Sequence, residues 1–488
     1  MATPIPINRC GLTLAEIARA TGGTPAGNLD IATAGVAGVA IDSRVVVAGG
    51  LFVALRGENH DGHGFLEDVA VRGAAAAIVE RGRAIDAIAC IEVDDTLAAL
   101  GALAKYHLAR TTSATALPVI AIGGSAGKTT TKELTAAAAR ARFGETLATP
   151  GNLNNLIGVP MTLFTLTAEH RAAVIECGTN QRGEVARIAA MVTPDVAIVL
   201  NADIEHSAGL GGIEEIADEE ATLFATARIA VASPDEPLVM ARVPNHMSRV
   251  TFGGSAGESG DADVRYERRP AADGAIETIL RLKPALVEAG IIPEMKIRMT
   301  LAGPAAAINA SAAVAAVAAA SAAPLTADEL ARCARALAAV EPVDGRLGAR
   351  EIGGITIIDD TYNANPRSVR IALATAAEMA RARGARLVVA LGDMLELGEL
   401  SPEAHRAIVR DVAAANTAIL IAVGPEMIAA CEVLVAIGGE SGVVAVADDS
   451  DRAGAAVAEL VKPGDVLLVK GSRGMRMERI ISALESAK

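Results

Sequence analysis

Short runs of apolar residues, separated by longer stretches of helical periodicity, recur along most of the chain. They stand at residues 119–122, 173–176, 196–200 and 229–232, and later at residues 355–359, 387–391, 419–423 and 466–470. Continuous apolar runs of this length between helices are typical of parallel strands that are buried on both faces. The pattern therefore predicts an α/β protein with mostly parallel sheets.

Changes in this rhythm predict three domains, at residues 1–114, 115–324 and 325–488. The first mixes short helices with strand-like runs such as residues 76–80, and a small polar stretch at residues 111–113 is interpreted as a linker. In the second, residues 295–299 alternate apolar with basic side chains, which predicts a half-exposed strand and some antiparallel structure. A chain of 488 residues is long enough for about three domains.

The amino-acid composition of the chain excludes some classes of binding partner. The chain has 44 Lys and Arg against 58 Asp and Glu, a net charge of −14, so it lacks the positive surface that unspecific binding to nucleic acid or anionic membranes needs. Its most apolar helical stretch, residues 305–323, is mostly Ala and is interrupted by Asn309, which indicates a buried helix without membrane insertion. The start of the chain lacks a signal-peptide core, and the five cysteines lack paired spacing. We expect a cytoplasmic protein with unpaired thiols and no zinc site.

The most specific local pattern is a glycine-rich turn between a predicted strand and a predicted helix. It consists of Gly123, Gly124, Ser125, Ala126, Gly127, Lys128, Thr129 and Thr130. Small residues allow backbone N–H groups to close around phosphate oxygens, and a helix N-terminus adds partial positive charge. Lys128 is placed to reach the β- and γ-phosphates, and the Thr129 hydroxyl to coordinate Mg²⁺. The alternative is a structural turn with an incidental lysine, since Ile122 stands where a strict phosphate-loop pattern has its first Gly.

Two further side chains follow predicted strands at the edge of the sheet where ligands bind. Glu176 ends one apolar run, and His206 follows the run that ends near residue 200. Taken alone, a carboxylate at a strand end is usually solvated and a single histidine often only packs. Together with the phosphate loop, Thr129, Glu176 and His206 predict a magnesium site.

Several separate motifs resemble the Mur ligase family, in the family's order and over nearly the whole chain. In the first region, the Asp-Ser-Arg at residues 42–44 and the segment at residues 50–63 look like its uridine-nucleotide-binding domain. In the second, residues 124–132 match its ATP loop, and residues 149–160 match a segment that faces the muramoyl peptide.

In the third region, the resemblance is to the MurF branch of the family specifically. The matching segments are residues 359–366, 392–398 and 470–473. The resemblance implies an N-terminal UDP-binding domain, a central P-loop ATPase domain and a C-terminal Rossmann-like domain. It further implies a monomer that uses ATP and Mg²⁺ to join D-Ala-D-Ala to UDP-N-acetylmuramoyl-tripeptide through an acyl phosphate, as a step of peptidoglycan synthesis.

The resemblance also implies roles for individual residues. Catalytic roles fall on Lys128, Glu176, His206 and Glu220. ATP contacts fall on Gly124, Ser125, Ala126, Gly127, Lys128, Thr129 and Thr130, with Asn309 near the adenine and Arg346, Asp360 and Asn363 near the ribose or phosphates. Substrate contacts fall on Ser43, Arg44, Asn152, Asn154, Asn155, Lys470 and Arg473. Arg346 has the alternative of an ordinary surface residue after a turn, and for Arg476 and Arg479 we favour the solvated start of the last helix.

The chain departs from the family pattern near the ATP site. Glu220 stands where relatives carry a lysine that is modified to a carbamate, and Gly123 replaces the usual threonine. Glu205 and the residues after His206 also differ from the usual Ala-His-Leu-Glu, and Ala305 and Ala306 replace a His-Asn pair. Glutamate is permanently anionic in water, so Glu220 is a candidate for the carbamate's electrostatic role. The alternative is that residues 218–220 form one solvated helix face.

These departures keep other functions open beside the MurF reaction. One is a catalytically weak nucleotide-binding scaffold with the same fold, against which the retained Lys128, Thr129, Glu176 and His206 argue. Another is a sister amide ligase, such as the enzyme that adds the third peptide residue or folylpolyglutamate synthase.

Overall fold

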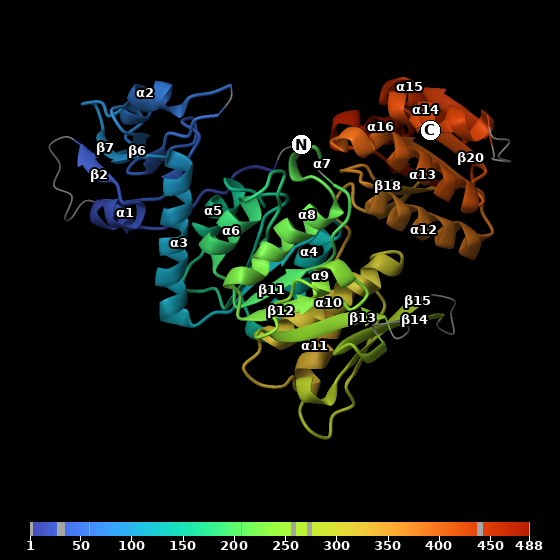
Figure 1. The fold of residues 1–488 in the computed structure, drawn as a ribbon, viewed down its shortest axis with the longest axis horizontal. Coiled ribbons are helices and arrows are strands. Elements are labelled where there is room, and N and C mark those ends of the chain that lie inside the picture. Colours follow the sequence, from blue (N-terminus) through green and yellow to red (C-terminus); the bar gives the residue numbers. More distant parts are fainter. Residues whose placement is uncertain are drawn as a thin grey trace.

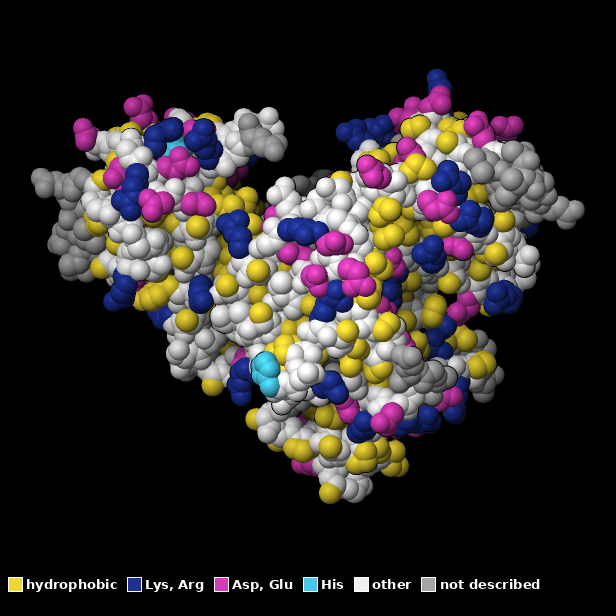
Figure 2. All heavy atoms as spheres, in the orientation of Figure 1, with side chains coloured by type: hydrophobic (Ala, Val, Ile, Leu, Met, Phe, Trp, Pro, Cys, Tyr) yellow, Lys and Arg dark blue, Asp and Glu magenta, His cyan; other side chains and the backbone are white. Residues whose placement is uncertain are grey.

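The computed structural model describes residues 3–26, 35–57, 59–205, 207–254, 260–270, 276–436 and 443–487. Three regions, each built on its own sheet, follow one another along the chain (Figure 1). Figure 2 shows a broad notch between the first and third regions, above the central one. In the described residues no helix combines the length and the hydropathy that crossing a membrane requires. The prediction of a three-part α/β protein is confirmed.

The first region holds a five-stranded sheet in the order β2-β7-β6-β5-β4. Its strands are β2 (Thr24–Ala26), β4 (Val39–Ala40), β5 (Leu51–Val53), β6 (Ala76–Glu80) and β7 (Ala89–Val93). Neighbouring strands are parallel except for β2, which is an antiparallel edge. The region also contains α1 (Leu14–Thr21), α2 (Leu66–Val71) and a ribbon of β1 (Leu12–Thr13) with β3 (Gly35–Val36).

Helix α3 (Thr96–Thr115) joins the first region to the central region. The prediction of a linker at residues 111–113 is wrong, because these residues form the last turns of α3. The hydroxyl groups of Thr111 and Thr112 donate to the carbonyl oxygens of His107 and Ala109 one turn earlier, so the polar side chains are satisfied within the helix.

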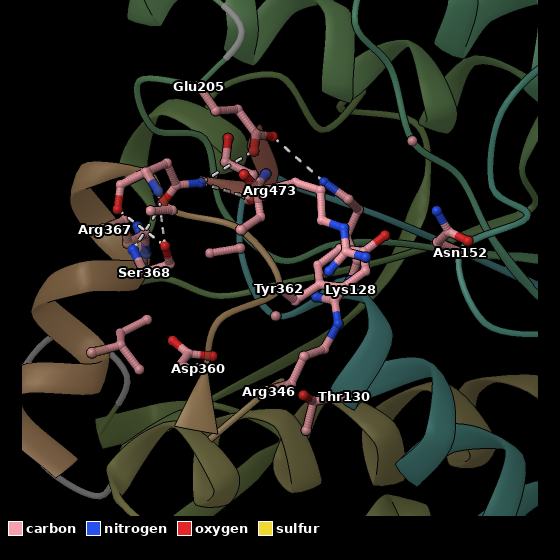
Figure 3. A pocket seen from close by; sticks show the side chains of 18 of the residues that line it. Lys128, Thr130, Asn152, Glu205, Arg346, Asp360, Tyr362, Arg367, Ser368 and Arg473 are labelled. Atoms are coloured by element: carbon pink, nitrogen blue, oxygen red, sulfur yellow. Dashed lines mark hydrogen bonds and ion pairs between the residues drawn. The ribbon is translucent and has the colours of Figure 1, made fainter. Parts of the chain in front are cut away.

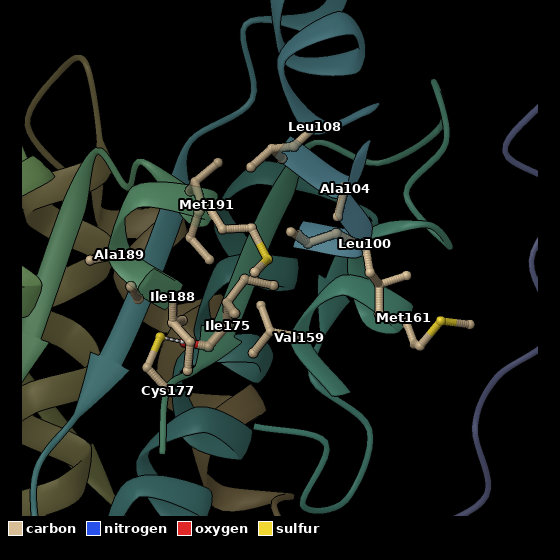
Figure 4. Packing of buried hydrophobic residues seen from close by; sticks show 14 of the residues in the cluster. Leu100, Ala104, Leu108, Val159, Met161, Ile175, Cys177, Ile188, Ala189 and Met191 are labelled. Atoms are coloured by element: carbon tan, nitrogen blue, oxygen red, sulfur yellow. Dashed lines mark hydrogen bonds between the residues drawn. The ribbon is translucent and has the colours of Figure 1, made fainter. Parts of the chain in front are cut away.

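Packing explains why α3 stays helical over this length. Its Leu100 and Leu108 belong to one buried cluster with Ile175 of the central sheet and Met191 of α6 (Figure 4). A Cβ at Gly101 would lie 2.9 Å from the Met191 methyl carbon, so the glycine in this helix allows close approach of α6. The first and central regions therefore share a core.

The central region is a nine-stranded sheet in the order β16-β15-β14-β13-β12-β11-β8-β10-β9. Its strands are β8 (Val119–Gly123), β9 (Thr146–Ala148), β10 (Ala172–Glu176), β11 (Val196–Val199), β12 (Ile229–Ala232), β13 (Ser248–Gly254), β14 (Val264–Pro270), β15 (Ile276–Leu282) and β16 (Glu294–Ile297). The strands from β9 to β14 run parallel, and β15 and β16 pair antiparallel. The predicted strands, including the antiparallel end, are confirmed.

Alternate side chains of β8 face two different cores, as expected for a central parallel strand. Ile120 and Ile122 pack toward α4 (Lys128–Phe143), α10 (Pro304–Ala320) and α11 (Ala327–Ala338). Val119 and Ala121 pack toward the core that contains α3, α5 (Gly158–Leu163) and α6 (Glu184–Val192). Along the chain, α6 is followed by α7 (Ser207–Leu210), α8 (Ile213–Ala221) and α9 (Pro237–Met240).

Helix α11 lies on the central region, although the predicted third domain begins at residue 325. Leu330 and Leu337 of α11 are buried in the same cluster as α4 and α10. The division between the central and third regions is therefore better drawn after residue 340.

The third region is a six-stranded sheet in the order β17-β18-β22-β19-β20-β21. Its strands are β17 (Gly348–Ile352), β18 (Ile355–Asp360), β19 (Leu387–Gly392), β20 (Ile419–Val423), β21 (Val443–Ala447) and β22 (Val466–Lys470). All pairings are parallel except that of the edge strand β17. One face carries α12 (Pro366–Arg383), α13 (Ser401–Ala414) and α14 (Pro425–Ala436), and the other carries α15 (Ser450–Leu460) and α16 (Glu478–Ala487).

Candidate active site

A cavity of about 450 Å³ lies between the central and third regions (Figure 3). It brings together most of the predicted site residues. Those that line it are Ser125, Ala126, Gly127, Lys128, Thr130, Asn152, Asn154, Asn155, Glu176, Asn309, Arg346, Asp360, Asn363, Lys470 and Arg473. Gly124, Thr129 and Glu220 lie behind this lining, and His206 lies outside the described residues.

The glycine-rich turn connects β8 to α4 with two residues in the left-handed region, Gly124 at φ +119° and Gly127 at φ +88°. No side chain in the described part of the chain caps the start of α4. The first amides of a helix have no intrahelical partners, so this helix start offers free donors and a partial positive charge to an anion. The geometry fits the predicted phosphate loop.

Asn201, which sequence reasoning did not single out, holds the shape of this loop. Its side-chain oxygen accepts a hydrogen bond from the Ala126 amide at 2.8 Å, and its side-chain nitrogen donates to the Ala126 carbonyl at 2.9 Å. The Ser125 amide donates to the Asn201 carbonyl at 3.1 Å. The only signal for this role in the sequence is that Asn201 follows the neighbouring parallel strand β11.

Lys128 is held between the loop and a carboxylate. Its ammonium donates to the Gly124 carbonyl at 2.5 Å and lies 3.4 Å from Glu205 Oε1. Burial alone would lower the pKa of Lys128, but the nearby carboxylates of Glu205, Glu220 and Glu176 outweigh this effect and raise the pKa. The lysine therefore stays charged.

Glu176 carries the chemistry expected of a cation ligand. Its Oε1 accepts hydrogen bonds from the Thr129 hydroxyl at 3.1 Å and from the Asn154 amide nitrogen at 2.8 Å. Its Oε2 is buried without a hydrogen-bond partner among the described residues. A buried carboxylate oxygen without a partner, beside a threonine hydroxyl, fits the oxygen ligands that Mg²⁺ prefers.

Glu220 is fully buried beneath the loop, so the alternative of a solvated helix face is wrong. Its Oε2 accepts a hydrogen bond from the Gly124 amide at 2.6 Å. The neighbouring Glu219 accepts from the Gly183 and Val185 amides at the start of α6. Burial raises the pKa of Glu220 to about 7, so in this environment the carboxyl is not permanently anionic.

Two of the departures from the family pattern meet in space. A Cβ at Gly123 would lie 2.8 Å from Glu220 Oε2. The glycine therefore leaves room for the carboxyl group, and the two residues depend on each other.

In the third region Lys470 has a structural position that sequence reasoning did not foresee. Lys470 and Asp360 end two paired parallel strands, β22 and β18. The buried ammonium donates to Asp360 Oδ2 and to the Asn363 carbonyl, both at 2.6 Å. The prediction that Lys470 contacts the substrate does not fit these contacts, because its charge is compensated within the region.

Two arginines meet on an aromatic ring at the cavity wall. The Arg346 guanidinium lies 4.1 Å from the centre of the Tyr362 ring, and that of Arg473 lies 6.0 Å from it. Because Arg346 lines the cavity and stacks on Tyr362, it is not an ordinary surface residue. Arg479 pairs with Asp451 on α15, in keeping with the solvated helix start that the sequence favours.

The three asparagines of the predicted peptide-facing segment have different neighbours. Asn154 contacts Glu176, as described above. Asn152 accepts a hydrogen bond from the Thr3 hydroxyl at 2.6 Å, and Asn155 accepts from the Gly158 amide at the start of α5.

The remaining predicted residues divide between the cavity and the first region. Asn309 reaches the phosphate loop, since a Cβ at Gly127 would lie 3.0 Å from its side-chain oxygen. Ser43 and Arg44 do not line the cavity, and Arg44 is exposed and pairs with Asp42 at 2.6 Å.

Three models of one family match the chain. They are the Mur ligase family, catalytic domain, over residues 35–108, the Mur ligase middle domain over residues 122–317, and the Mur ligase, glutamate ligase domain over residues 345–473. A UDP-N-acetylmuramoyl-tripeptide–D-alanyl-D-alanine ligase of Treponema pallidum is 34% identical over 91% of this chain and 93% of its own. The chain belongs to the Mur ligase family. The ligase of the same name from Escherichia coli is 32% identical over 92% of this chain and 93% of its own.

Solved Mur ligase structures agree with this assignment and confirm the resemblance to the MurF branch. A crystal structure of MurF from Acinetobacter baumannii matches with a TM-score of 0.83 at 30% identity, over 98% of this chain and 99% of that chain. MurF ligase from Thermotoga maritima in complex with ADP has a TM-score of 0.76 at 24% identity, over 92% and 97% of the two chains, and shares the fold. A folylpolyglutamate synthase reaches a TM-score of only 0.54 at 16% identity, over 78% and 92%, so that alternative is not favoured.

Proposed function

We propose that this Mur ligase joins D-Ala-D-Ala to the C-terminal carboxylate of UDP-N-acetylmuramoyl-tripeptide, with conversion of ATP to ADP and phosphate. The observation that carries the proposal is that the open start of α4 and Lys128 line the same cavity as Tyr362 and the two arginines of the third region. The identity of the substrates rests on relatives that cover almost the whole chain. The protein acts as a cytoplasmic monomer.

The first step needs two anions to approach each other. A carboxylate oxygen of the tripeptide attacks the γ-phosphorus of ATP, the bond to the bridging oxygen breaks, and ADP leaves with an acyl phosphate remaining. The Lys128 ammonium and the amides of the loop place fixed positive charge at the transferring phosphoryl group. Thr129, Glu176 and His206 would hold Mg²⁺, which would supply further positive charge against the anionic reactants.

The second step forms the amide bond. The neutral amine of D-Ala-D-Ala attacks the acyl carbon, and the tetrahedral intermediate collapses with release of phosphate and of the amine proton. We assign the carboxylate of the dipeptide to Arg473, which is half exposed and lines the cavity. Asn309, Arg346, Asp360 and Asn363 contact the nucleotide, the asparagines at positions 152, 154 and 155 face the peptide, and Ser43 and Arg44 bind the uridine end.

Glu220 contributes through the loop. Its carboxyl accepts the Gly124 amide, and it adds negative charge near Lys128 when it is ionised. This arrangement gives the site a built-in acidic group where relatives use a modified lysine.

The test is a reaction of the purified protein with ATP, Mg²⁺, D-Ala-D-Ala and UDP-N-acetylmuramoyl-tripeptide, with the third residue either diaminopimelate or lysine. Phosphate is expected only when both substrates are present, with a product at the pentapeptide mass. L-Ala-L-Ala is the matched control for the amine. ATP binding without product from either tripeptide would overturn the proposal in favour of a nucleotide-binding scaffold.

A further inference from the structure

Glu205 lies between Lys128, at the end of the phosphate loop, and the third region (Figure 3). It follows β11 in the central region and is only 6% exposed. One carboxylate oxygen, Oε1, is 3.4 Å from the Lys128 ammonium. The other, Oε2, accepts a hydrogen bond from the side-chain nitrogen of Asn365 at 3.2 Å. One carboxylate therefore contacts both walls of the cavity.

Asn365 is the N-cap of α12, the first helix after β18. Its side-chain oxygen accepts from the Ser368 amide at 2.8 Å, which leaves its side-chain nitrogen free to reach across the cavity. That nitrogen also lies 3.4 Å from the carbonyl of Ser125 in the phosphate loop. The partial positive charge at the start of α12 favours an anion at the position of Glu205.

Other contacts hold the two regions together farther from the loop. Arg367 on α12 pairs with Glu236 of the central region, and the Ser207 hydroxyl donates to the Leu397 carbonyl at 2.8 Å. Within the described residues, these contacts do not include Lys128. Glu205 is thus the side chain through which the lysine meets α12.

We propose that Glu205 is a positioning residue that couples the state of Lys128 to the start of α12. The inference rests on the proposed function, in which Lys128 binds the triphosphate. Without nucleotide, Glu205 holds Lys128 and Asn365 at once. When Lys128 moves to the phosphates of a bound nucleotide, the Glu205 carboxylate keeps only its hydrogen bond with Asn365. Nucleotide binding therefore changes the contacts at the start of α12 in the third region. Glu205 also opposes ATP binding, because it competes for Lys128 and adds negative charge beside the phosphates.

Three substitutions separate the two contacts of this carboxylate. Glu205→Gln keeps an oxygen that accepts from Asn365 but removes the charge that holds Lys128. Glu205→Ala removes both. Asn365→Ser keeps an N-cap for α12 but removes the amide nitrogen that reaches Glu205. Glu403→Gln, on the exposed side of α13, is the matched control for loss of a carboxylate.

The experiment measures the dissociation constant of ATP, the hydrogen exchange of residues 365–371 with and without ATP, and kcat and KM for each substrate. Glu205→Gln is expected to bind ATP about fivefold more tightly, because the amide neither competes for Lys128 nor places negative charge beside the phosphates. In this variant the start of α12 stays as protected without nucleotide as in the parent. In Glu205→Ala the exchange at this segment rises and no longer responds to ATP, while the control behaves as the parent.

A double-mutant cycle gives the decisive result. Glu205→Ala and Asn365→Ser are expected to be non-additive, with the double variant no more exposed at α12 than either single variant. Additive effects, or unchanged ATP affinity in Glu205→Gln, would overturn this inference while product formation by the parent leaves the proposed function standing. A parent that binds no ATP would instead overturn the proposed function.

Discussion

The central and third regions each place a helix start at the same cavity, but they prepare it in opposite ways. α4 begins after Gly127, and no side chain in the described part of the chain caps it. α12 begins after Asn365, which forms a capping box with Ser368, and has Pro366 at its first turn. In a capped helix start the side chain of the cap accepts from a backbone N–H group of the first turn, whereas the N–H groups of an uncapped start need acceptors outside the helix. The start of α4 therefore leaves backbone donors open to a ligand, whereas the start of α12 meets the Glu205 carboxylate through the side chain of its cap, Asn365.

The two lysines at these walls differ in the same sense. The Lys470 side chain is 2% exposed and is neutralised by Asp360 at 2.6 Å. The Lys128 side chain is 15% exposed, and its nearest carboxylate is at 3.4 Å. The shorter and more buried pair of Lys470 with Asp360 stabilises the fold. The longer pair of Lys128 with Glu205 leaves the Lys128 ammonium available to a ligand.

The largest expected effect comes from breaking the Lys470 pair. Lys470→Ala leaves Asp360 buried without its partner, which is expected to lower the free energy of unfolding by about 3–5 kcal/mol. Chemical denaturation measures this loss, with Lys462→Ala, at an exposed position, as the control. A variant of normal stability whose KM for D-Ala-D-Ala rises would show instead that Lys470 holds the substrate.

The corresponding change in the central region acts on rate rather than stability. Lys128→Ala removes fixed positive charge from the transferring phosphoryl group, and phosphate release is expected to slow by about 100-fold to 1,000-fold, or about 3–4 kcal/mol. The loss of unfolding free energy is expected to be smaller than that of Lys470→Ala. Equal destabilisation of the two variants would contradict the distinction between the two lysines.

The smallest expected effect is a change in how the unfolding free energy depends on pH, and it concerns Glu220 of the central region. Because burial raises the pKa of Glu220 from 4.5 to about 7, the folded chain keeps this proton when the unfolded chain has lost it. The resulting stability is complete below pH 4.5 and is lost as the pH rises to about 7, with a slope of at most about 1.4 kcal/mol per pH unit. Glu220→Gln should therefore gain stability relative to the parent across this window and stay parallel to it above.

Unfolding free energies of the parent and of Glu220→Gln, measured from pH 4 to pH 8, test this expectation, with Glu403→Gln as the exposed control. A constant difference between the parent and Glu220→Gln would show that Glu220 does not titrate in this range.

The elements that sequence predicts well are those whose signal is local. The apolar runs that became β12, β20 and β22 are buried on both faces, and a continuous run reports that burial directly. The phosphate loop is also local, because its glycines, Lys128 and the start of α4 lie within a few residues of one another.

What the sequence leaves open depends on pairing between distant segments. The contact between Lys470 and Asp360 requires the register of β22 on β18, and the role of Asn201 requires β11 beside β8. Residues 111–113 are small and polar and so resemble a linker, because the packing of α3 against the central region, which stabilises the helix, is not visible in the sequence. For the same reason, the sequence left open whether Glu220 is solvated, since helical spacing alone does not reveal the loop beneath which it is buried.

Helix α3 also sets a distance. With 20 residues, it is about 30 Å long, and it begins at the sheet of the first region and runs into the shared core beside the central sheet. A rod of this kind works as a ruler: it does not shorten or lengthen as a flexible tether would. A substrate whose uridine end is anchored in the first region would have to match that length to bring its peptide end to Lys128, so the span between the two ends selects the molecule as much as the groups at either end.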